Sequence, residues 1–187
     1  MFFITRADRA VSEFVQRLRF QPLTWFMIRA SEWWVKWLVI GGLGGLADLR
    51  RRAFPWTALW ATAAAGVASG LTTLIKDAVG RARPWVADPA IHAVPNLPGG
   101  WSFPSGHAST AFAAATVVAF LRPGLRWWVI SIAALVAASR VYLGYHFTSD
   151  VLAGAVLGVA VGLLTAFVGP LLAARAARAR ARSSQVA

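Results

Sequence analysis

The chain has 187 residues, 58% of them hydrophobic and only 14% charged, and its formal net charge is +12. A soluble domain of this length carries about a quarter charged residues, and so small a protein cannot hide this much apolar helix from water. The composition therefore excludes an ordinary soluble domain and predicts an integral membrane protein. The absence of cysteine excludes disulfide bonds and thiolate chemistry.

The N-terminal segment, residues 1–32, is predicted to form an amphipathic helix that lies on the membrane surface. Val11, Phe14, Val15 and Leu18 recur at helical spacing, with charged residues between them. A short, poorly inserted span is the alternative. Charged residues at positions 6, 8 and 9 interrupt the start of the chain, so we expect no cleavable signal peptide.

Five apolar segments follow, at about residues 33–47, 53–75, 106–121, 127–139 and 151–174. With their flanks they reach the roughly 20 residues that a bilayer-spanning helix needs. Lys36 lies near one end of the first segment, where a long side chain can reach the interface. We therefore predict one all-α membrane domain over residues 1–187. Its helical bundle core, residues 33–174, has five to six transmembrane helices, and a basic cytoplasmic tail, residues 175–187, follows.

Arginine clusters follow alternate spans: Arg50, Arg51 and Arg52; Arg122 and Arg126; Arg175, Arg178, Arg180 and Arg182. With five spans all of them lie on one side, which the positive-inside rule makes cytoplasmic. The long loop, residues 76–104, and the connection 145–150 then lie on the opposite side. The N-terminal arginines conflict with this assignment, because they lie on that outer side too. We interpret the charge as a topology signal that also favours the lipid bilayer as a partner, and we expect no nucleic acid.

Gly154, Gly158 and Gly162 recur every four residues in the last apolar segment. Such a ridge of small residues lets a neighbouring helix approach closely, and simple tolerance of glycine in a lipid-embedded helix is an equal alternative. A homodimer through this ridge is the protein partner that the pattern allows.

Three short motifs gather the ionisable residues: KDAVGRARP (residues 76–84), PSGH (104–107) and SRVYLGYHFTSD (139–150). Each alone has an ordinary explanation, as headgroup anchors, a helix start or a structural hydrogen bond. All three lie on the predicted outer face, however, and ionisable residues at a membrane boundary are costly and by default functional. Together they indicate one site.

The cations of this site indicate that it binds phosphate. Lys76, Arg83 and Arg140 bring positive charge to a small volume, and arginine forks match pairs of phosphate oxygens. Ser105 and Gly106 begin a helix, whose N-terminus also favours an anion. These five residues are the candidate phosphate ligands.

Two histidines and an aspartate indicate phosphoester hydrolysis. His146 and Asp150 can meet across one helical turn, although Thr148 and Ser149 between them can instead cap a helix start. An aspartate on one imidazole nitrogen leaves the other free to attack phosphorus, so His146 is the candidate nucleophile and Asp150 its orienting partner. His107 is the candidate acid that protonates the leaving oxygen.

A metal-dependent mechanism is the rival within this chemistry. Only Asp77, Asp88 and Asp150 fall near the site, and two-metal phosphatases need more oxygen ligands. We expect neither a metal nor another cofactor.

At these motifs the sequence resembles the type 2 phosphatidic acid phosphatase family, whose superfamily includes the vanadium-dependent haloperoxidases. The family pattern is Lys, six residues, Arg-Pro; then Pro-Ser-Gly-His; then Ser-Arg, five residues, His, three residues, Asp. All three parts occur in order without a substitution, and the resemblance spans about residues 54–172. It implies a helical bundle and the roles given above for Lys76, Arg83, Ser105, Gly106, His107, Arg140 and His146. Membrane members commonly have six spans, whereas this chain shows five and an amphipathic segment.

The leading interpretation is a multi-pass membrane lipid phosphatase that works through a phosphohistidine intermediate. Its predicted substrate is a polyprenyl (undecaprenyl or decaprenyl) diphosphate in carrier-lipid recycling, with phosphatidylglycerophosphate or phosphatidic acid as alternatives. We expect it in the inner or plasma membrane, with the active site facing the periplasm or the cell exterior. A vanadate-dependent oxidase and a non-catalytic lipid-phosphate binder are the alternatives outside this class.

Overall fold

The computed structural model describes residues 6–32, 40–94 and 97–183, with side chains up to residue 171. Its elements are α1 (Arg6–Arg17), α2 (Gln21–Ser31), α4 (Gly42–Arg50), α5 (Trp56–Val79), α6 (Pro84–Ala87), α7 (Gly106–Leu121), η2 (Pro123–Leu125), α8 (Arg126–Tyr142) and α9 (Thr148–Ser183). Within the described ranges no strand occurs. The prediction of an all-α protein is confirmed for this part of the chain.

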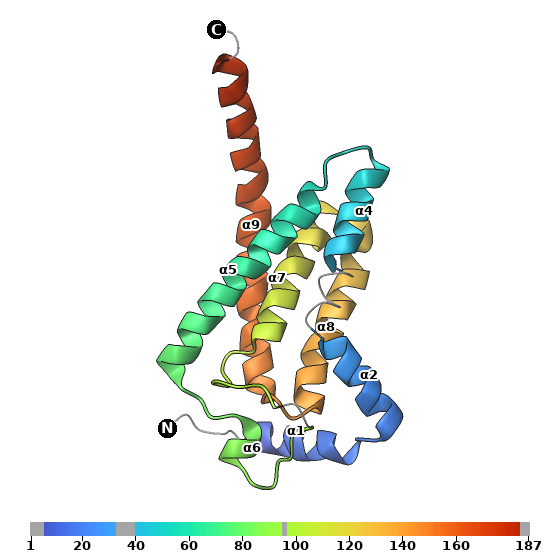
Figure 1. Cartoon of the computed structure of the whole chain (residues 1–187), viewed down its shortest axis with the longest axis vertical. Coiled ribbons are helices and arrows are strands. Elements are labelled where there is room, and N and C mark those ends of the chain that lie inside the picture. Colours follow the sequence, from blue (N-terminus) through green and yellow to red (C-terminus); the bar gives the residue numbers. More distant parts are fainter. Residues whose placement is uncertain (1–5, 33–39, 95–96, 184–187) are drawn as a thin grey trace.

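The long helices form a bundle with α7 at its centre. α7 packs against α5, α8 and α9, and Figure 1 shows it in yellow-green between α5 and α8. Its sequence, GHASTAFAAATVVAFL, is rich in alanine, and small side chains let neighbouring helices approach closely. Most of its alanine and valine side chains are buried, as expected of a helix that is apolar around its whole circumference. The central helix therefore begins with the PSGH motif.

Three stretches of described helix are long and apolar enough to cross a membrane: Trp56–Ala87, Pro123–Tyr142 and Thr148–Leu171. α7 is a shorter apolar helix. Large apolar side chains cover the outside of the bundle, and Leu74, Val156 and Leu164 are 68%, 71% and 66% exposed. Apolar surface of this extent is typical of contact with lipid. The chain is thus a helical membrane protein, as predicted.

Three predicted segments differ from the observed helices. The N-terminal segment, predicted to form one amphipathic helix within residues 1–32, contains two helices, α1 and α2. The first predicted span, residues 33–47, lies partly outside the described residues, as does Lys36, and its described end belongs to α4. The predicted basic tail is continuous with the last span, because α9 runs as one helix to Ser183 and projects beyond the bundle (Figure 1). Alanine and arginine dominate this stretch, and both favour helix.

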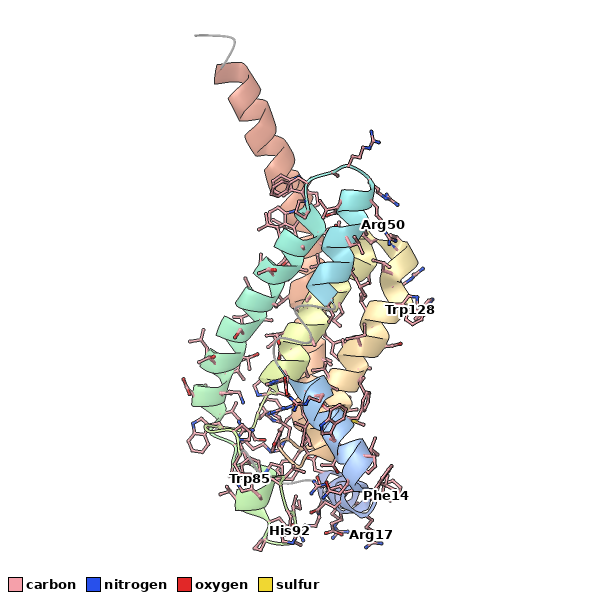
Figure 2. All side chains as sticks on the ribbon, turned by 45° about the vertical axis from the view of Figure 1, so that its right-hand side comes forward. Phe14, Arg17, Arg50, Trp85, His92 and Trp128 are labelled. Atoms are coloured by element: carbon pink, nitrogen blue, oxygen red, sulfur yellow. The ribbon has the colours of Figure 1, made fainter. Side chains whose placement is uncertain are left out.

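The two ends of the bundle differ in what they carry. Figure 2 shows Arg50 and Trp128 toward one end, and Trp85, His92 and Arg17 at the other. The second end holds α1, α6 and the loop that leads to α7. The arginine cluster at the α4–α5 turn and the motif-bearing loop therefore lie at opposite ends, as the positive-inside interpretation requires.

Two of the N-terminal arginines, Arg9 and Arg19, have partners at the loop end. Arg9 pairs with Asp88 at 2.7 Å. Arg19 donates to the carbonyl of Tyr142 at 2.8 Å and to the carbonyl of His92 at 2.7 Å. These side chains attach α1 and its following turn to the loop and to α8. The positive charge of Arg9 and Arg19 therefore has a structural use.

A buried carboxylate joins three helices at the other end. Asp48 of α4 accepts the backbone N–H of Thr57 at 2.7 Å and its hydroxyl at 2.9 Å, and it pairs with Arg122. Thr57 lies in the first turn of α5, so Asp48 satisfies a backbone donor that has no partner within that helix. Arg122, predicted as part of the topology signal, therefore also holds the end of α7 to α4.

The glycine ridge of α9 packs against α7 of the same chain. A Cβ at Gly154 would lie 2.5 Å from the carbonyl oxygen of Ser105, and one at Gly162 would lie 2.6 Å from a side-chain carbon of Thr116. At Gly158 an added Cβ would overlap the carbonyl oxygen of Ser109. The predicted close helix contact is present, but the prediction of a homodimer through the ridge is wrong, because α7 already covers it.

Replacing Gly158 with alanine is expected to destabilise the protein by about 1–3 kcal/mol, because the added methyl group forces α9 away from α7. Gly66→Ala is the matched control, since nothing lies within 4 Å of a Cβ at that exposed position on α5. The control is expected to be neutral or up to about 1 kcal/mol stabilising. Thermal unfolding in detergent measures both, and equal melting temperatures for the two variants would contradict the close contact.

Candidate active site

The structure brings the three motifs together at one end of the bundle. KDAVGRARP ends α5 and leads into α6, PSGH begins α7, and SRVYLGYHFTSD joins α8 to α9. Nη1 of Arg83 lies 3.5 Å from Nε2 of His146, which links the first and third motifs. The backbone N–H of Ser105 donates to the carbonyl of Asp150 at 2.9 Å, which links the second and third. Residues distant in the sequence thus meet around His146.

A tight turn between α8 and α9 carries His146. Gly144 makes this turn possible, because its φ is +76°, a conformation that side-chain-bearing residues rarely adopt. A Cβ at Gly144 would also lie 2.8 Å from a backbone carbonyl oxygen of the facing loop. The turn therefore holds His146 close to the loop that bears Arg83.

The start of α9 directs Asp150 toward His146. The carboxylate of Asp150 accepts the backbone N–H of Phe147 at 2.9 Å, which caps the helix from its first turn. Asp150, rather than Thr148 or Ser149, makes this cap. Because a capping side chain folds back over the helix start, Asp150 faces the imidazole that precedes the helix.

The imidazole of His146 is buried, with 3% of its surface exposed. Its Nδ1 lies 3.6 Å from Oδ2 of Asp150 and 3.4 Å from Oγ of Ser102, while Nε2 faces Arg83. Burial, together with the charges of Arg83 and Arg140, lowers the pKa of His146 from 6.5 to about 4, although Asp150 opposes the shift. The ring is therefore neutral at pH 7. With its proton on Nδ1, toward Asp150, Nε2 keeps the lone pair that a nucleophile needs.

Histidine-selective NMR of the substrate-free protein in detergent is expected to show one imidazole that titrates near pH 4. His146 gains its proton only as the pH falls through about 4, because burial favours the neutral ring. The His146→Gln protein identifies the resonance, since it lacks this ring alone. A midpoint for His146 at or above about 6.5, the unperturbed value, would contradict a buried neutral imidazole.

Asp150 has two further partners that the sequence analysis did not assign to the site. Nη1 of Arg81 lies 2.5 Å from one carboxylate oxygen, and the hydroxyl of Ser102 donates to the other at 2.5 Å. Both partners are buried, and Asp150 itself has no exposed surface. Arg81 lies within the KDAVGRARP motif, just after Gly80 ends α5 in a left-handed conformation, with a φ of +61°. This helix-ending glycine is the sequence signal that separates Arg81 from the α5 surface.

The predicted phosphate ligands of the first motif hold backbone carbonyls. Lys76 donates to the carbonyls of Trp101 and Ser102, at 2.5 and 3.3 Å. Arg83 donates to the carbonyls of Gly99, Gly100 and Tyr145, at 2.8, 2.9 and 2.9 Å. The segment 99–102 therefore faces both cations. Nη1 of Arg83 also lies next to Nε2 of His146.

Arg140 reaches the site from the end of α8. Its backbone carbonyl accepts the N–H groups of Tyr145 and His146, at 3.0 and 3.2 Å, so it also shapes the turn. Its buried guanidinium lies 4.6 Å from the centre of the Tyr145 ring and donates to the hydroxyl of Ser31 in α2. A cavity of about 270 Å³ adjoins it, lined by Ile28, Ser31, Glu32, Pro98, Arg140, Leu143 and Tyr145. Arg140 is thus placed between the turn of His146 and this cavity.

The N-terminus of α7 forms the remaining side of the site. Ser105 is the N-cap of α7, and its hydroxyl accepts the backbone N–H of Ala108 at 3.5 Å. A Cβ at Gly106 would lie 3.6 Å from a methyl group of Thr72, one turn before Lys76 on α5. His107 lies in the first turn of α7 and is partly exposed. The side chain of Ser105 is therefore committed to the helix cap, whereas the start of α7 itself offers the helix N-terminus that favours an anion.

The described residues contain no group of three or more histidine, aspartate or glutamate side chains that is placed to hold a metal ion. Asp88 pairs with Arg9, and Asp77 is exposed on α5. Of the three acids predicted to lie near the site, only Asp150 contacts His146.

Comparison with known proteins relates this arrangement to a family. The family model described as the PAP2 superfamily matches residues 54–170. Decaprenylphosphoryl-5-phosphoribose phosphatase of Mycobacterium tuberculosis is 40% identical over 135 residues, which cover 72% of this chain and 72% of that protein. Phosphatidylglycerophosphatase B of Bacillus subtilis is 33% identical over 172 residues, which cover 83% of this chain and 80% of that protein.

Among solved structures, the fold is similar to a transmembrane PAP2-type phosphatidylglycerolphosphate phosphatase from Bacillus subtilis. The TM-score is 0.71 at 28% sequence identity, and the match covers 88% of this chain and 85% of that one. The superposed part extends well beyond the three motifs and includes most of the helical bundle.

Proposed function

Because this chain belongs to the PAP2 superfamily and is a membrane lipid phosphatase, we propose that it releases phosphate from a polyprenyl-linked substrate through a phosphohistidine intermediate. One observation carries the proposal: Nδ1 of His146 lies 3.6 Å from Asp150, and Nε2 lies 3.5 Å from Arg83. A neutral imidazole held in this way has its free nitrogen beside a cation that attracts phosphate. We propose a single membrane phosphatase domain over the whole chain.

The proposed binding step uses the cations around His146. Lys76, Arg83 and Arg140 neutralise the phosphate oxygens, and the start of α7 at Ser105 and Gly106 adds a helix N-terminus. Phosphate oxygens are charged and accept stronger hydrogen bonds than backbone carbonyls do. On binding, they therefore replace some of the carbonyls of segment 99–102 on Lys76 and Arg83.

The proposed chemistry has two displacements at phosphorus. In the first, Nε2 of His146 forms a P–N bond while the P–O bond to the lipid breaks, and His107 donates a proton to the leaving oxygen. Asp150 stabilises the positive charge that develops on the ring. In the second, His107 takes a proton from water, the water oxygen attacks phosphorus, and the P–N bond breaks to release inorganic phosphate.

An apolar groove beside the site supports a lipid substrate. The groove has a volume of about 550 Å³ between α1, α2, α8 and α9, and its lining includes Leu18, Met27, Val141 and Leu152. Thr148, two residues after His146, also lies in its wall. We propose that part of the substrate's hydrocarbon chain lies in this groove while the headgroup reaches the cations.

The similarity to a decaprenylphosphoryl-5-phosphoribose phosphatase favours a polyprenyl chain. The similarity to phosphatidylglycerophosphatase B keeps a glycerolipid, phosphatidylglycerophosphate or phosphatidic acid, as the second candidate. The two classes share the phosphate chemistry of the site and differ in the chain that the groove receives.

We propose that the protein crosses the inner or plasma membrane with five to six spans and that the site faces the periplasm or the cell exterior. The arginine cluster at the end opposite to the site supports this orientation (Figure 2). α1 fits an amphipathic helix on the membrane surface, because Phe14 and Leu18 are 61% and 50% exposed, whereas Asp8 and Ser12 are buried. Part of its apolar face is therefore open to lipid at Phe14, while Val15 packs against the bundle and Leu18 lines the apolar groove.

A substrate panel tests the proposed function. Purified protein in excess chelator is expected to release phosphate from decaprenyl diphosphate with a kcat/KM at least about tenfold above that for phosphatidylglycerophosphate or phosphatidic acid, a difference of about 1.4 kcal/mol in transition-state binding. Preference for either glycerolipid would support the second candidate. Strict dependence on added magnesium, or vanadate-dependent halide oxidation without phosphate release, would contradict the proposed reaction.

A further inference from the structure

Asp8 of the N-terminal helix α1 is buried beside the turn between α8 and α9 that carries His146. Only 3% of its surface is exposed. One carboxylate oxygen accepts Nη2 of Arg81 at 2.8 Å and the hydroxyl of Ser149 at 2.6 Å, and the other accepts the backbone N–H of Ser149 at 2.9 Å. Asp8 precedes the residues that match the family model, 54–170, and lies in none of the three motifs.

Arg81 connects Asp8 to Asp150. Its Nη1 lies 2.5 Å from Oδ1 of Asp150, while its Nη2 holds Asp8. The guanidinium is 7% exposed and lies 4.5 Å from the centre of the Phe147 ring, in the turn that carries His146. One buried cation therefore joins two carboxylates, one from α1 and one from α9.

The carboxylate of Asp8 remains charged in this setting. Burial raises the pKa of Asp8, but hydrogen bonds from Ser149 and Arg81 and the charge of Arg81 outweigh it and hold the pKa below its usual range. A buried guanidinium is costly unless its N–H donors have hydrogen-bond acceptors. Arg81 meets this need with one carboxylate at each terminal nitrogen. Asp8 supplies the acceptor on the side of Arg81 that Asp150 does not occupy.

We infer that Asp8 is a positioning residue for the catalytic pair. It holds Arg81 and Ser149 in place, Arg81 fixes the carboxylate of Asp150, and Asp150 orients the imidazole of His146. This inference deepens the proposed function and rests on it. Asp8 contacts Arg81 and Ser149, so its effect is expected to reach the reaction through Arg81, Ser149 and Asp150.

Other contacts attach α1 to the protein without Asp8. Arg9 pairs with Asp88, and Gln16 accepts the backbone N–H of His92 at 2.7 Å. These contacts reach the loop and not the catalytic pair. Arg9→Gln is therefore a matched control, because it weakens the docking of the same helix at the neighbouring position while leaving Arg81 and Asp150 untouched.

The test compares Asp8→Asn, which keeps the shape of the side chain, with Arg9→Gln in the full-length protein. Asp8→Asn is expected to lower kcat about 10- to 100-fold, the range typical of groups that orient a reacting residue through another. KM is expected to stay within about twofold, because the cations that bind phosphate are unchanged. Arg9→Gln is expected to keep kcat within about twofold. Equal losses in the two variants, or no loss in Asp8→Asn, would overturn the positioning role.

A double-mutant cycle with Asp150→Asn tests whether Asp8 acts through Asp150, and the melting temperature of each variant shows that the protein remains folded. If Asp8 acts through Asp150, the double variant is expected to lose no more kcat than Asp150→Asn alone. Losses that multiply would show an independent effect and overturn the inference.

Histidine-selective NMR adds a readout that needs no turnover. The His146 resonance is expected to shift in substrate-free Asp8→Asn and to stay in place in Arg9→Gln, and an unshifted resonance would count against the positioning role. If His146→Gln is inactive while Asp8→Asn is unchanged, only the role of Asp8 fails. If His146→Gln remains active, the phosphohistidine scheme fails instead.

Discussion

Replacing His146 with glutamine is expected to lower kcat for phosphate release by at least about 10⁴-fold, the scale of loss when a covalent nucleophile is removed. Glutamine has no lone pair on a basic ring nitrogen, so no P–N bond forms. The expected change in KM is small, because the residues proposed to bind the phosphate, Lys76 and Arg83, are unchanged. Steady-state phosphate release from a lipid phosphate in detergent measures both parameters.

His92→Gln is the control for this substitution. His92 is an exposed histidine of the loop, and its described contacts are made by its backbone N–H and carbonyl. Its replacement is expected to keep kcat within about twofold. Residual activity of His146→Gln within about tenfold of the unchanged protein would mean that water attacks phosphorus directly, and that His146 does not act as the nucleophile.

Replacing Asp150 with asparagine is expected to lower kcat by about 10³- to 10⁴-fold, comparable to the loss in a triad whose imidazole adopts the wrong tautomer. An asparagine can present its NH₂ group to Nδ1 of His146, which would move the ring proton to Nε2 and remove the attacking lone pair. It also leaves Arg81 with one carboxylate partner instead of two.

Loss of a buried charge can also unfold a protein, so the Asp150→Asn result needs a folding control. Removing one partner of a buried pair costs about 3–5 kcal/mol, and Asp8 remains as a partner for Arg81. Asp77→Asn removes an exposed acid of α5 and is expected to change neither kcat nor the melting temperature. An Asp150→Asn protein that stays folded, binds inorganic phosphate normally and keeps more than about a tenth of kcat would contradict the orienting role.

The sequence predicted the residues of the candidate site that would meet the phosphate and the catalytic pair. It did not predict the residues that hydrogen-bond to Asp150 and hold it in place. Lys76, Arg83, His146 and Asp150 are spaced in motifs that flank apolar helices, so their presence at one membrane boundary followed from span lengths alone. Arg81 and Ser102 contact Asp150 because of how the loop between α5 and α7 folds back. Gly80 marks the end of α5 before Arg81, but nothing in the local pattern indicates that Arg81 contacts Asp150.

Contacts between residues distant in the sequence also explain why the predictions for the glycine ridge and for the N-terminal segment were incomplete. The pattern of Gly154, Gly158 and Gly162 correctly predicted a close helix contact, but periodicity does not say whether the partner helix belongs to the same chain. The apolar residues of the N-terminal segment predicted that it lies on the membrane surface. The contact of its polar face with the rest of the protein depends on the pairing of Asp8 with Arg81, 73 positions later. Such pairings become visible only when the helices are placed in space.

The charge balance of the site follows from the same contacts. The sequence placed three cations, Lys76, Arg83 and Arg140, around one phosphate. The structure adds Arg81, but Asp8 and Asp150 occupy its guanidinium. The added cation therefore pairs with the carboxylates, and the three predicted residues remain the proposed source of positive charge for a phosphate.

The most direct test of a covalent histidine intermediate is to trap it. A diphosphate substrate with radiolabelled terminal phosphate is mixed with His107→Gln protein and quenched within milliseconds in alkali, where phosphohistidine is stable. The lipid monophosphate that leaves needs little protonation, so loss of His107 is expected to slow hydrolysis of the intermediate more than its formation. Label on the peptide that contains His146, and none when His146 is replaced as well, is the predicted result. Label on no residue or on another residue, with phosphate still released, would contradict it.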